Sequence, residues 1–166
     1  VVLASPHPNR MREVTGSNLR QLRNGFYAWL MQTDDGLDLL TRDEGRLMAQ
    51  FAFGDAISEE EREVYRAEWH DPPERIRRMA NWYRAAYSPV LMNPDTPIEI
   101  PPCPVPTRYV HGEDDFAFVP ELATGSGAWV TGEFDEVLVE GVGHWLAQTE
   151  PERVAELVAD WVSRHG

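Results

Sequence analysis

The stretch HGEDDFAFVP, residues 111–120, places an acidic loop at the end of the apolar segment VPTRYVHG, 105–112. The same arrangement recurs further along the chain, where GVGHW at 141–145 ends the apolar segment EVLVEG, 136–141. Both apolar segments predict short strands, and a helical pattern follows each of the two loops. Short strands that alternate with helices form parallel sheets with helices on their faces. The sequence therefore predicts an α/β fold.

Further elements extend this pattern in both directions. The run VVLA at 1–4 is typical of a buried strand, and Val154, Leu157 and Trp161 mark one face of a terminal amphipathic helix. The middle of the chain predicts only helices, at about 17–32, 43–53, 59–69 and 72–87. The last two of these begin at capping boxes, SEEE at 58–61 and DPPE at 71–74.

A proline-rich segment returns the chain from the helical block to the strands. Seven prolines lie within 88–106, which predicts an irregular linker. We therefore expect a core of residues 1–16 and 93–166, with parallel strands and flanking helices, interrupted by an inserted all-helical lid at 17–92.

Composition limits the possible partners. Twenty-eight acidic residues against fifteen basic ones give a net charge of −13, which disfavours nucleic acid and anionic membranes because phosphate binding needs a positive patch. No apolar run is long enough to span a membrane and no secretion leader is visible, so we expect a cytoplasmic protein. The single cysteine, Cys103, excludes an internal disulfide. No metal site is predicted, because His7, His70, His111 and His165 lack ligand spacing and are expected in loops or on the surface.

The two loops carry the candidate chemistry. Ligand sites of open parallel sheets lie just beyond the carboxyl ends of the strands, so an acidic loop and His144 are expected at the same edge. An aspartate there could hold the imidazole in one tautomer and stabilise its protonated form. An acid followed by a histidine after the last two strands is also the end of the order nucleophile, acid, histidine.

These loops, together with NWYR at 81–84 and ASPHP at 4–8, closely resemble the C-terminal part of α/β-hydrolases, with epoxide hydrolases and haloalkane dehalogenases as the most similar groups. The resemblance covers essentially the whole chain but only the second half of the family's fold. It implies a partial α/β-hydrolase fold with a helical lid. It also implies that Asp115, which matches the family pattern of Gly, two variable residues and Asp, is the catalytic acid and His144 the general base. Asp114 is the alternative acid.

The resemblance implies a mechanism and a pocket. In epoxide hydrolases an aspartate nucleophile opens the epoxide to an ester, and the histidine activates the water that hydrolyses it. Two lid tyrosines donate hydrogen bonds to the epoxide oxygen, and Tyr83 of NWYR matches one of them, with a plain core aromatic as the alternative. The second position falls on Leu30, and Tyr27, three residues earlier, points about 60° away from the expected direction. No cofactor is implied. The predicted walls around a small, mostly apolar substrate are Tyr27, Trp29, Leu30, Phe116 and Trp145.

One part of the family's machinery is missing from the sequence. It contains no G-x-S-x-G elbow, no equivalent with Asp or Cys, and no glycine-rich oxyanion loop, so we expect the isolated chain to be inactive. We expect VVLA at 1–4 to pair with a missing N-terminal hydrolase segment or with a second copy of the chain, because an unpaired apolar edge invites association. The nucleophile stays open between Asp and Ser, which leaves an ester or haloalkane hydrolase as alternatives. The alternative to an enzyme is a non-catalytic hydrolase remnant that acts as a binding or interaction module.

Overall fold

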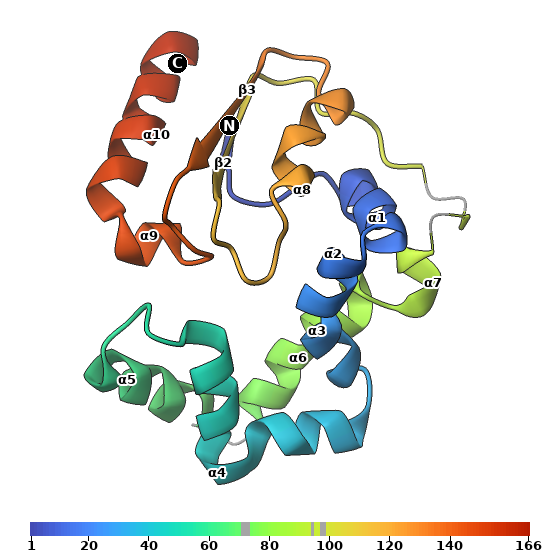
Figure 1. Ribbon diagram of the computed structural model, residues 1–166, viewed down its shortest axis with the longest axis vertical. Coiled ribbons are helices and arrows are strands. Elements are labelled where there is room, and N and C mark those ends of the chain that lie inside the picture. Colours follow the sequence, from blue (N-terminus) through green and yellow to red (C-terminus); the bar gives the residue numbers. More distant parts are fainter. Residues whose placement is uncertain (71–73, 94, 97–98) are drawn as a thin grey trace. The chain divides into compact units, whose positions relative to one another are not determined.

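The computed structural model describes residues 1–70, 74–93, 95–96 and 99–166, which form two compact units (Figure 1). The first unit combines Val1–Asn24 with Met92–Gly166, and the second is Gly25–Leu91. The first holds all the strands of the described chain, and the second is helical. The chain is thus an α/β unit with a helical unit inserted into it.

The sheet of the first unit is parallel throughout, as the sequence predicted. Its order is β1 (Val2–Leu3), β2 (Thr107–Gly112), β3 (Phe134–Val139). The register of β2 and β3 pairs Thr107 with Phe134 and Gly112 with Val139, so both strands end at the same level. Val110 of β2 and Val139 of β3 form a buried cluster with Val142 and Leu146, which follow β3.

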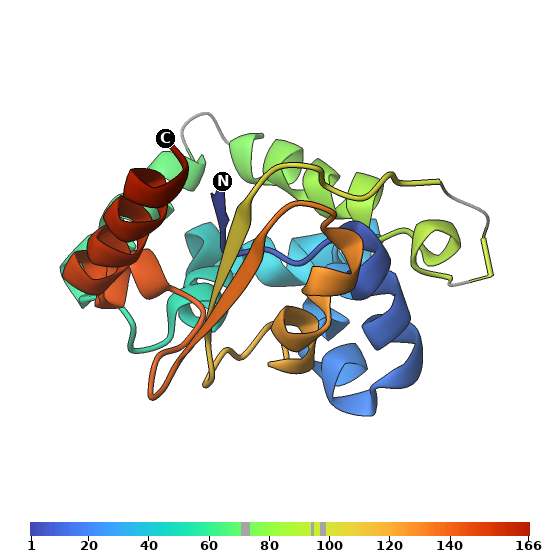
Figure 2. The same ribbon diagram turned by 90° about the horizontal axis from the view of Figure 1, so that it is seen from above.

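Helices cover both faces of this sheet (Figure 2). The terminal helix α10 (Pro151–His165) lies on one side, preceded by the short α9 (Leu146–Thr149). On the other side lie α1 (Pro8–Ser17), α8 (Glu121–Thr124) and the 3-10 helix η1 (Ser126–Trp129).

Arg108 fastens α10 to the sheet. Its side chain is 5% exposed and donates to Asp135 on β3 at 2.7 Å and to Asp160 on α10 at 2.8 Å. It also donates to the Leu157 carbonyl at 2.8 Å, and its guanidinium lies 4.9 Å from the Trp161 ring centroid. A buried guanidinium needs such partners, because an unpaired buried charge is strongly destabilising.

The helix α1 was not predicted, because the segment SPHPNR at 5–10, with two prolines and mostly polar residues, indicates a loop after the first strand. Pro8 instead occupies the first turn, where its missing N–H costs nothing, and the His7 side chain accepts from the Asn9 N–H at 3.2 Å. Met11 and Val14, three residues apart, are the apolar side chains that α1 buries. The capping signal was therefore a histidine rather than Ser, Thr, Asp or Asn.

The predicted helix at 17–32 is two helices, α2 (Leu19–Asn24) and α3 (Phe26–Leu30), separated by a turn at Gly25. The predicted lid, which began at 17, therefore started too early: α2 belongs to the first unit. Polar contacts attach α2 to the first unit, since its only buried residue, Gln21, binds the backbone of residues 117 and 119. The proline-rich linker also begins with a short helix, α7 (Pro89–Met92).

The second unit consists of α3 and three longer helices, α4 (Asp34–Phe53), α5 (Glu59–His70) and α6 (Arg75–Ala86). The predicted helix at 43–53 is the second part of α4, which has a break with positive φ at Asp43, Glu44 and Gly45. The capping box at 58–61 is confirmed, since Ser58 and Glu61 exchange backbone–side-chain bonds of 2.8 and 3.2 Å. The predicted box at 71–74 lies largely outside the described residues.

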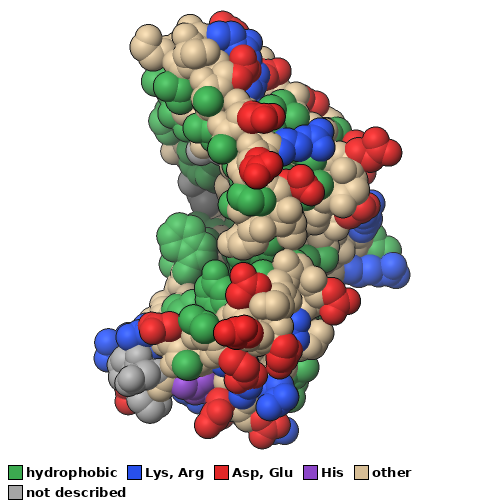
Figure 3. All heavy atoms as spheres, turned by 90° about the vertical axis from the view of Figure 1, so that its left-hand side faces the viewer, with side chains coloured by type: hydrophobic (Ala, Val, Ile, Leu, Met, Phe, Trp, Pro, Cys, Tyr) green, Lys and Arg blue, Asp and Glu red, His purple; other side chains and the backbone are tan. Residues whose placement is uncertain are grey.

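Acidic side chains and arginines are interspersed on α10 of the first unit and, separately, on α5 of the second unit (Figure 3). Ion pairs such as Arg164–Asp160 on α10 and Arg62–Glu59 on α5 join them. Among the described residues, no helix is both long enough and apolar enough to cross a bilayer.

Candidate active site

The site is built by two loops that leave the same edge of the sheet. Asp115 follows the end of β2 by three residues, and His144 follows the end of β3 by five. The loops are joined through their backbones, since the Glu113 N–H donates to Val139 O at 3.1 Å and the Asp114 N–H donates to Val142 O at 3.0 Å. The equal ends of the two parallel strands thus bring the loops together.

Gly112 permits this close approach. A Cβ at this position would lie 2.3 Å from the carbonyl oxygen of Val142 and 2.5 Å from that of Gly143. Both obstacles are backbone atoms of the loop that carries His144, so no side-chain rotation could relieve the clash. The glycine of the HGEDD stretch therefore sets the distance between the two loops.

Asp115 and His144 form a hydrogen-bonded pair. The Asp115 side chain is 5% exposed, and its Oδ2 accepts from Nδ1 of His144 at 2.9 Å. Its Oδ1 accepts from the backbone N–H groups of Ala117 at 2.6 Å and Phe118 at 2.9 Å. Because an ionised carboxylate only accepts, Nδ1 carries the proton and Nε2 is the ring nitrogen with a lone pair for a further proton. Asp114, the alternative acid, is exposed.

Three aromatic rings surround the imidazole. The ring centroids of Phe116, Phe118 and Trp145 lie 5.2, 5.4 and 5.1 Å from that of His144, and the His144 side chain is 25% exposed. Phe116 and Trp145 were among the predicted pocket walls. Phe118 was missed, although it lies three residues after Asp115 in the same loop. These rings partly shield the imidazole from water while leaving one side accessible.

A second histidine lies beneath the acidic loop, where the sequence indicated only a loop or surface position. His111 is 2% exposed on β2, and its Nδ1 lies 3.3 Å from the Tyr109 hydroxyl. Burial lowers the pKa of His111, although the charge of Asp115 acts in the opposite direction. Burial, and then the same charge, raises the pKa of Tyr109. Both groups are therefore neutral at pH 7, so neither adds a charge beside the pair.

The remaining predicted site residues lie in the second unit. Tyr27 and Tyr83 meet edge to face with ring centroids 5.5 Å apart, and Tyr27 also lies 5.0 Å from Phe51. Burial raises the pKa of Tyr83, and a hydrogen bond with Tyr27 partly offsets this. The Tyr83 phenol therefore remains a protonated donor at pH 7. Trp29 and Leu30 are half-buried on the same short helix, α3.

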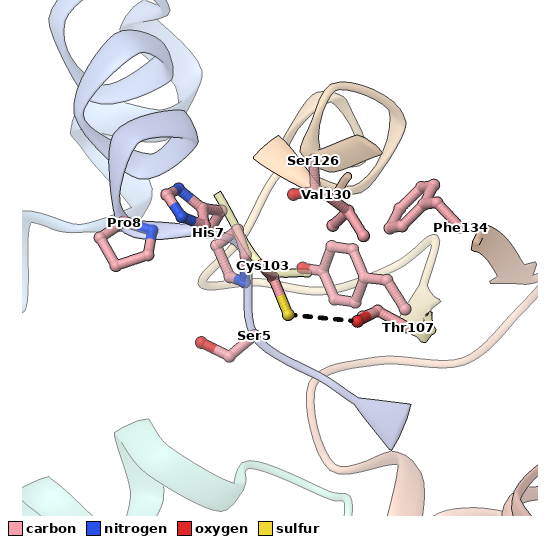
Figure 4. Close-up of a pocket in the computed structure, with 10 residues that line it drawn as sticks. Ser5, His7, Pro8, Cys103, Thr107, Ser126, Val130 and Phe134 are labelled. Carbon is pink, nitrogen blue, oxygen red and sulfur yellow. Dashed lines mark hydrogen bonds between the residues drawn. The ribbon is translucent and has the colours of Figure 1, made fainter. Parts of the chain in front are cut away.

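A separate cavity of about 270 Å³ opens in the first unit (Figure 4). Its walls include Pro8, Val130 and Phe134, and the thiol of Cys103 lies in it 3.6 Å from the Thr107 hydroxyl. That hydroxyl lowers the pKa of the thiol. Neither residue of the hydrogen-bonded pair lines the cavity. Across the described chain, no three His, Cys, Asp or Glu side chains are grouped so that they could hold a metal ion.

A model of the alpha/beta hydrolase family matches residues 1–157. Among solved structures, an epoxide hydrolase from Bacillus megaterium has a TM-score of 0.80 at 17% identity over 95% of this chain and 58% of its own. Epoxide hydrolase A from Mycobacterium thermoresistibile has a TM-score of 0.64 at 19% identity over 98% of this chain and 60% of its own. Potato epoxide hydrolase I has a TM-score of 0.51 at 24% identity over 68% and 36%.

These similarities show a shared fold. The chain spans 58% to 60% of the length of the two bacterial structures. Comparison with the curated proteins gives no match.

Proposed function

The chain belongs to the alpha/beta hydrolase family, and from this premise we propose that it supplies the acid–histidine pair of a lid-bearing hydrolase of the epoxide-hydrolase type. The observation that carries the proposal is the 2.9 Å bond between Asp115 and Nδ1 of His144, at the carboxyl ends of adjacent parallel strands. An acid there orients the imidazole and stabilises its protonated form.

The proposed reaction has two steps. A carboxylate nucleophile attacks one carbon of the epoxide, the carbon–oxygen bond breaks, and the oxygen takes a proton from a phenol. Nε2 of His144 then removes a proton from water, whose oxygen attacks the carbonyl of the resulting ester. As the ester bond breaks, the imidazolium gives that proton to the departing diol oxygen, and the second proton of the water restores the phenol, which leaves the free carboxylate. Asp115 stays ionised through both steps and offsets the charge that His144 acquires.

We propose Tyr83 as the phenol, with Tyr27 as its hydrogen-bond partner. Their contact, with ring centroids 5.5 Å apart, supports this assignment, because one phenol can orient the hydroxyl of the other. Phe116 and Trp145 are proposed as walls of an apolar substrate pocket, since their rings flank the imidazole.

We propose that a segment outside this sequence supplies the nucleophile, because the sequence contains no nucleophile elbow. In the described sheet β1 pairs with β2 alone, so its other edge is open to a further strand. We propose that a nucleophile-bearing hydrolase segment pairs there, with a second copy of this chain as the alternative partner. The 58% coverage of the Bacillus megaterium structure is consistent with such a complement.

The test uses the complete polypeptide that the gene encodes and a His144→Gln variant. Each is mixed with a slight excess of protein over a small aryl epoxide, and its intact mass is followed through one turnover. Wild type should form the diol, whereas His144→Gln should accumulate a covalent adduct whose added mass equals that of the epoxide, because ester hydrolysis lacks its base. His165→Gln, which changes a histidine on α10, is the matched control and should turn over like wild type.

Other outcomes would redirect the proposal. Turnover of an alkyl halide or an aryl ester in place of the epoxide would identify one of the two alternative hydrolases. With a serine nucleophile, His144 also activates the attacking hydroxyl, so the variant would form no adduct. If wild type neither reacts nor forms an adduct with any of the three substrates, the chain is a non-catalytic remnant. Unchanged turnover by His144→Gln would remove the histidine from the mechanism.

A further inference from the structure

The short helix α2 is attached to the first unit by a polar side chain. Its apolar residues Leu19 and Leu22 are 63% and 42% exposed, whereas Gln21 is 1% exposed. Burying an amide is costly unless its donor and acceptor both find partners. The position of Gln21 therefore has to be explained by what the amide binds.

Gln21 binds the acidic loop with both ends of its amide. Its Nε2 donates to the carbonyl of Ala117 at 3.0 Å, and its Oε1 accepts from the N–H of Val119 at 3.0 Å. The backbone of Gln21 is also held at the start of α2, because Oδ1 of Asn18 accepts from the Gln21 N–H at 3.1 Å. The side chain thus binds Ala117, which lies 96 positions further along the chain, and Val119, which lies 98 positions further along.

The segment of residues 117–119, which Gln21 binds, also binds the carboxylate of Asp115. Oδ1 of Asp115 accepts from the N–H groups of Ala117 and Phe118, so Asp115 and Gln21 bind neighbouring groups of one strip of backbone. The Val119 carbonyl in turn accepts from the Leu122 N–H at 2.9 Å, which anchors the strip to α8. The orientation of the carboxylate is therefore set by a backbone that Gln21 fixes.

We propose that Gln21 is a positioning residue for the Asp115–His144 pair. Without its amide, the Ala117 carbonyl and the Val119 N–H would be buried without partners, and the strip would open toward water to satisfy them. The two N–H donors to Asp115 would move with it, and the carboxylate would lose the orientation that meets Nδ1 of His144. A consequence for turnover rests on the proposed function, but the effect on the geometry of the pair does not.

Gln21→Met provides the test, because methionine keeps the length and apolar stem of glutamine while removing both hydrogen bonds. Gln32→Met is the matched control: Gln32 also donates to two backbone carbonyls, those of Ala28 and Tyr83, but within the second unit. Two NMR readouts on the intact chain apply, neither of which needs a substrate. One is the downfield resonance of the His144 Nδ1–H, with Asp115→Asn as its negative reference, and the other is amide exchange at 117–119.

In Gln21→Met we expect exchange at the Ala117 and Phe118 amides to be at least about tenfold faster than in wild type, and the His144 Nδ1–H resonance to broaden or disappear. Gln32→Met should retain both signals. A folded Gln21→Met variant that keeps the wild-type resonance and exchange rates would overturn the proposal. Should Gln21→Met not fold, wild type alone decides, because a Val119 N–H that exchanges as fast as exposed amides would equally overturn it. Loss of the resonance without any turnover by the complete polypeptide would leave the positioning role intact and refute only the proposed function.

Discussion

Replacing Gly112 with alanine should separate the two loops of the site. The added Cβ would lie 2.3 and 2.5 Å from the carbonyl oxygens of Val142 and Gly143, where side-chain contacts essentially never come closer than 3.0 Å. The loop that carries His144 must therefore move by at least about 0.7 Å, the difference between 2.3 and 3.0 Å. Such overpacking costs about 1–3 kcal/mol. Stretching the bond from Asp114 N–H to Val142 O and the bond from His144 to Asp115 removes about 2 kcal/mol more.

We therefore expect Gly112→Ala to lower the free energy of unfolding by about 3–5 kcal/mol and to weaken the His144 Nδ1–H signal. Urea denaturation followed by circular dichroism measures the first effect, and proton NMR measures the second. Gly143→Ala is the matched control, since its Cβ would meet only the Asp114 carbonyl at an ordinary 3.7 Å. A loss below about 1 kcal/mol in Gly112→Ala, or equal losses in both variants, would refute the role of Gly112 as the spacer between the loops.

Three further predictions concern buried charged or titratable groups in the two units. Arg108→Met should lower Tm by at least about 4 °C, because Asp135, Asp160 and a helix carbonyl all lose the hydrogen bond from the buried guanidinium, whereas the more exposed Arg164→Met should change Tm little. Burial holds the pKa of His111 below its unfolded value of about 6.5, so the unfolded chain binds more protons in acid; stability should fall as pH drops below about 6.5, and His111→Gln should flatten that slope in urea titrations between pH 8 and 5. Burial, and then the neighbouring phenol of Tyr83, raises the pKa of Tyr87 to about 12; ultraviolet difference titration against Tyr87→Phe should show a phenol that ionises there, and a midpoint near 10 would contradict its burial.

The inserted position of the helical unit gives Gln21 a particular setting. It lies four residues before Gly25, where the second unit begins, and it binds the loop that carries the acid of the pair. The chain enters the second unit directly after α2 and re-enters the first unit at Met92. Gln21 is therefore close in sequence to the start of the second unit and also binds the backbone that orients Asp115.

The strand and helix pattern, the parallel sheet and the two loops were predictable from local sequence. Alternating apolar segments and helical periodicity are properties of ten or fifteen neighbouring residues, and parallel strands place their carboxyl ends at one edge wherever they occur. Asp115 and His144 follow strands that end in register, so their sequence positions were enough to expect them together. The capping box at Ser58 was readable for the same reason, because both partners lie within one turn.

What the tertiary structure decided involves residues distant in sequence. The assignment of α2 to the first unit depends on the hydrogen bonds of Gln21 to residues 117 and 119. No local sequence pattern predicts that a glutamine binds the backbone of a distant loop. The burial of His111 depends on the helices packed over its face of the sheet, and the place of Phe118 beside His144 depends on the fold of the acidic loop. A local pattern reports which way a side chain points relative to its own element, whereas the partner it meets is set by chain segments that are distant in sequence.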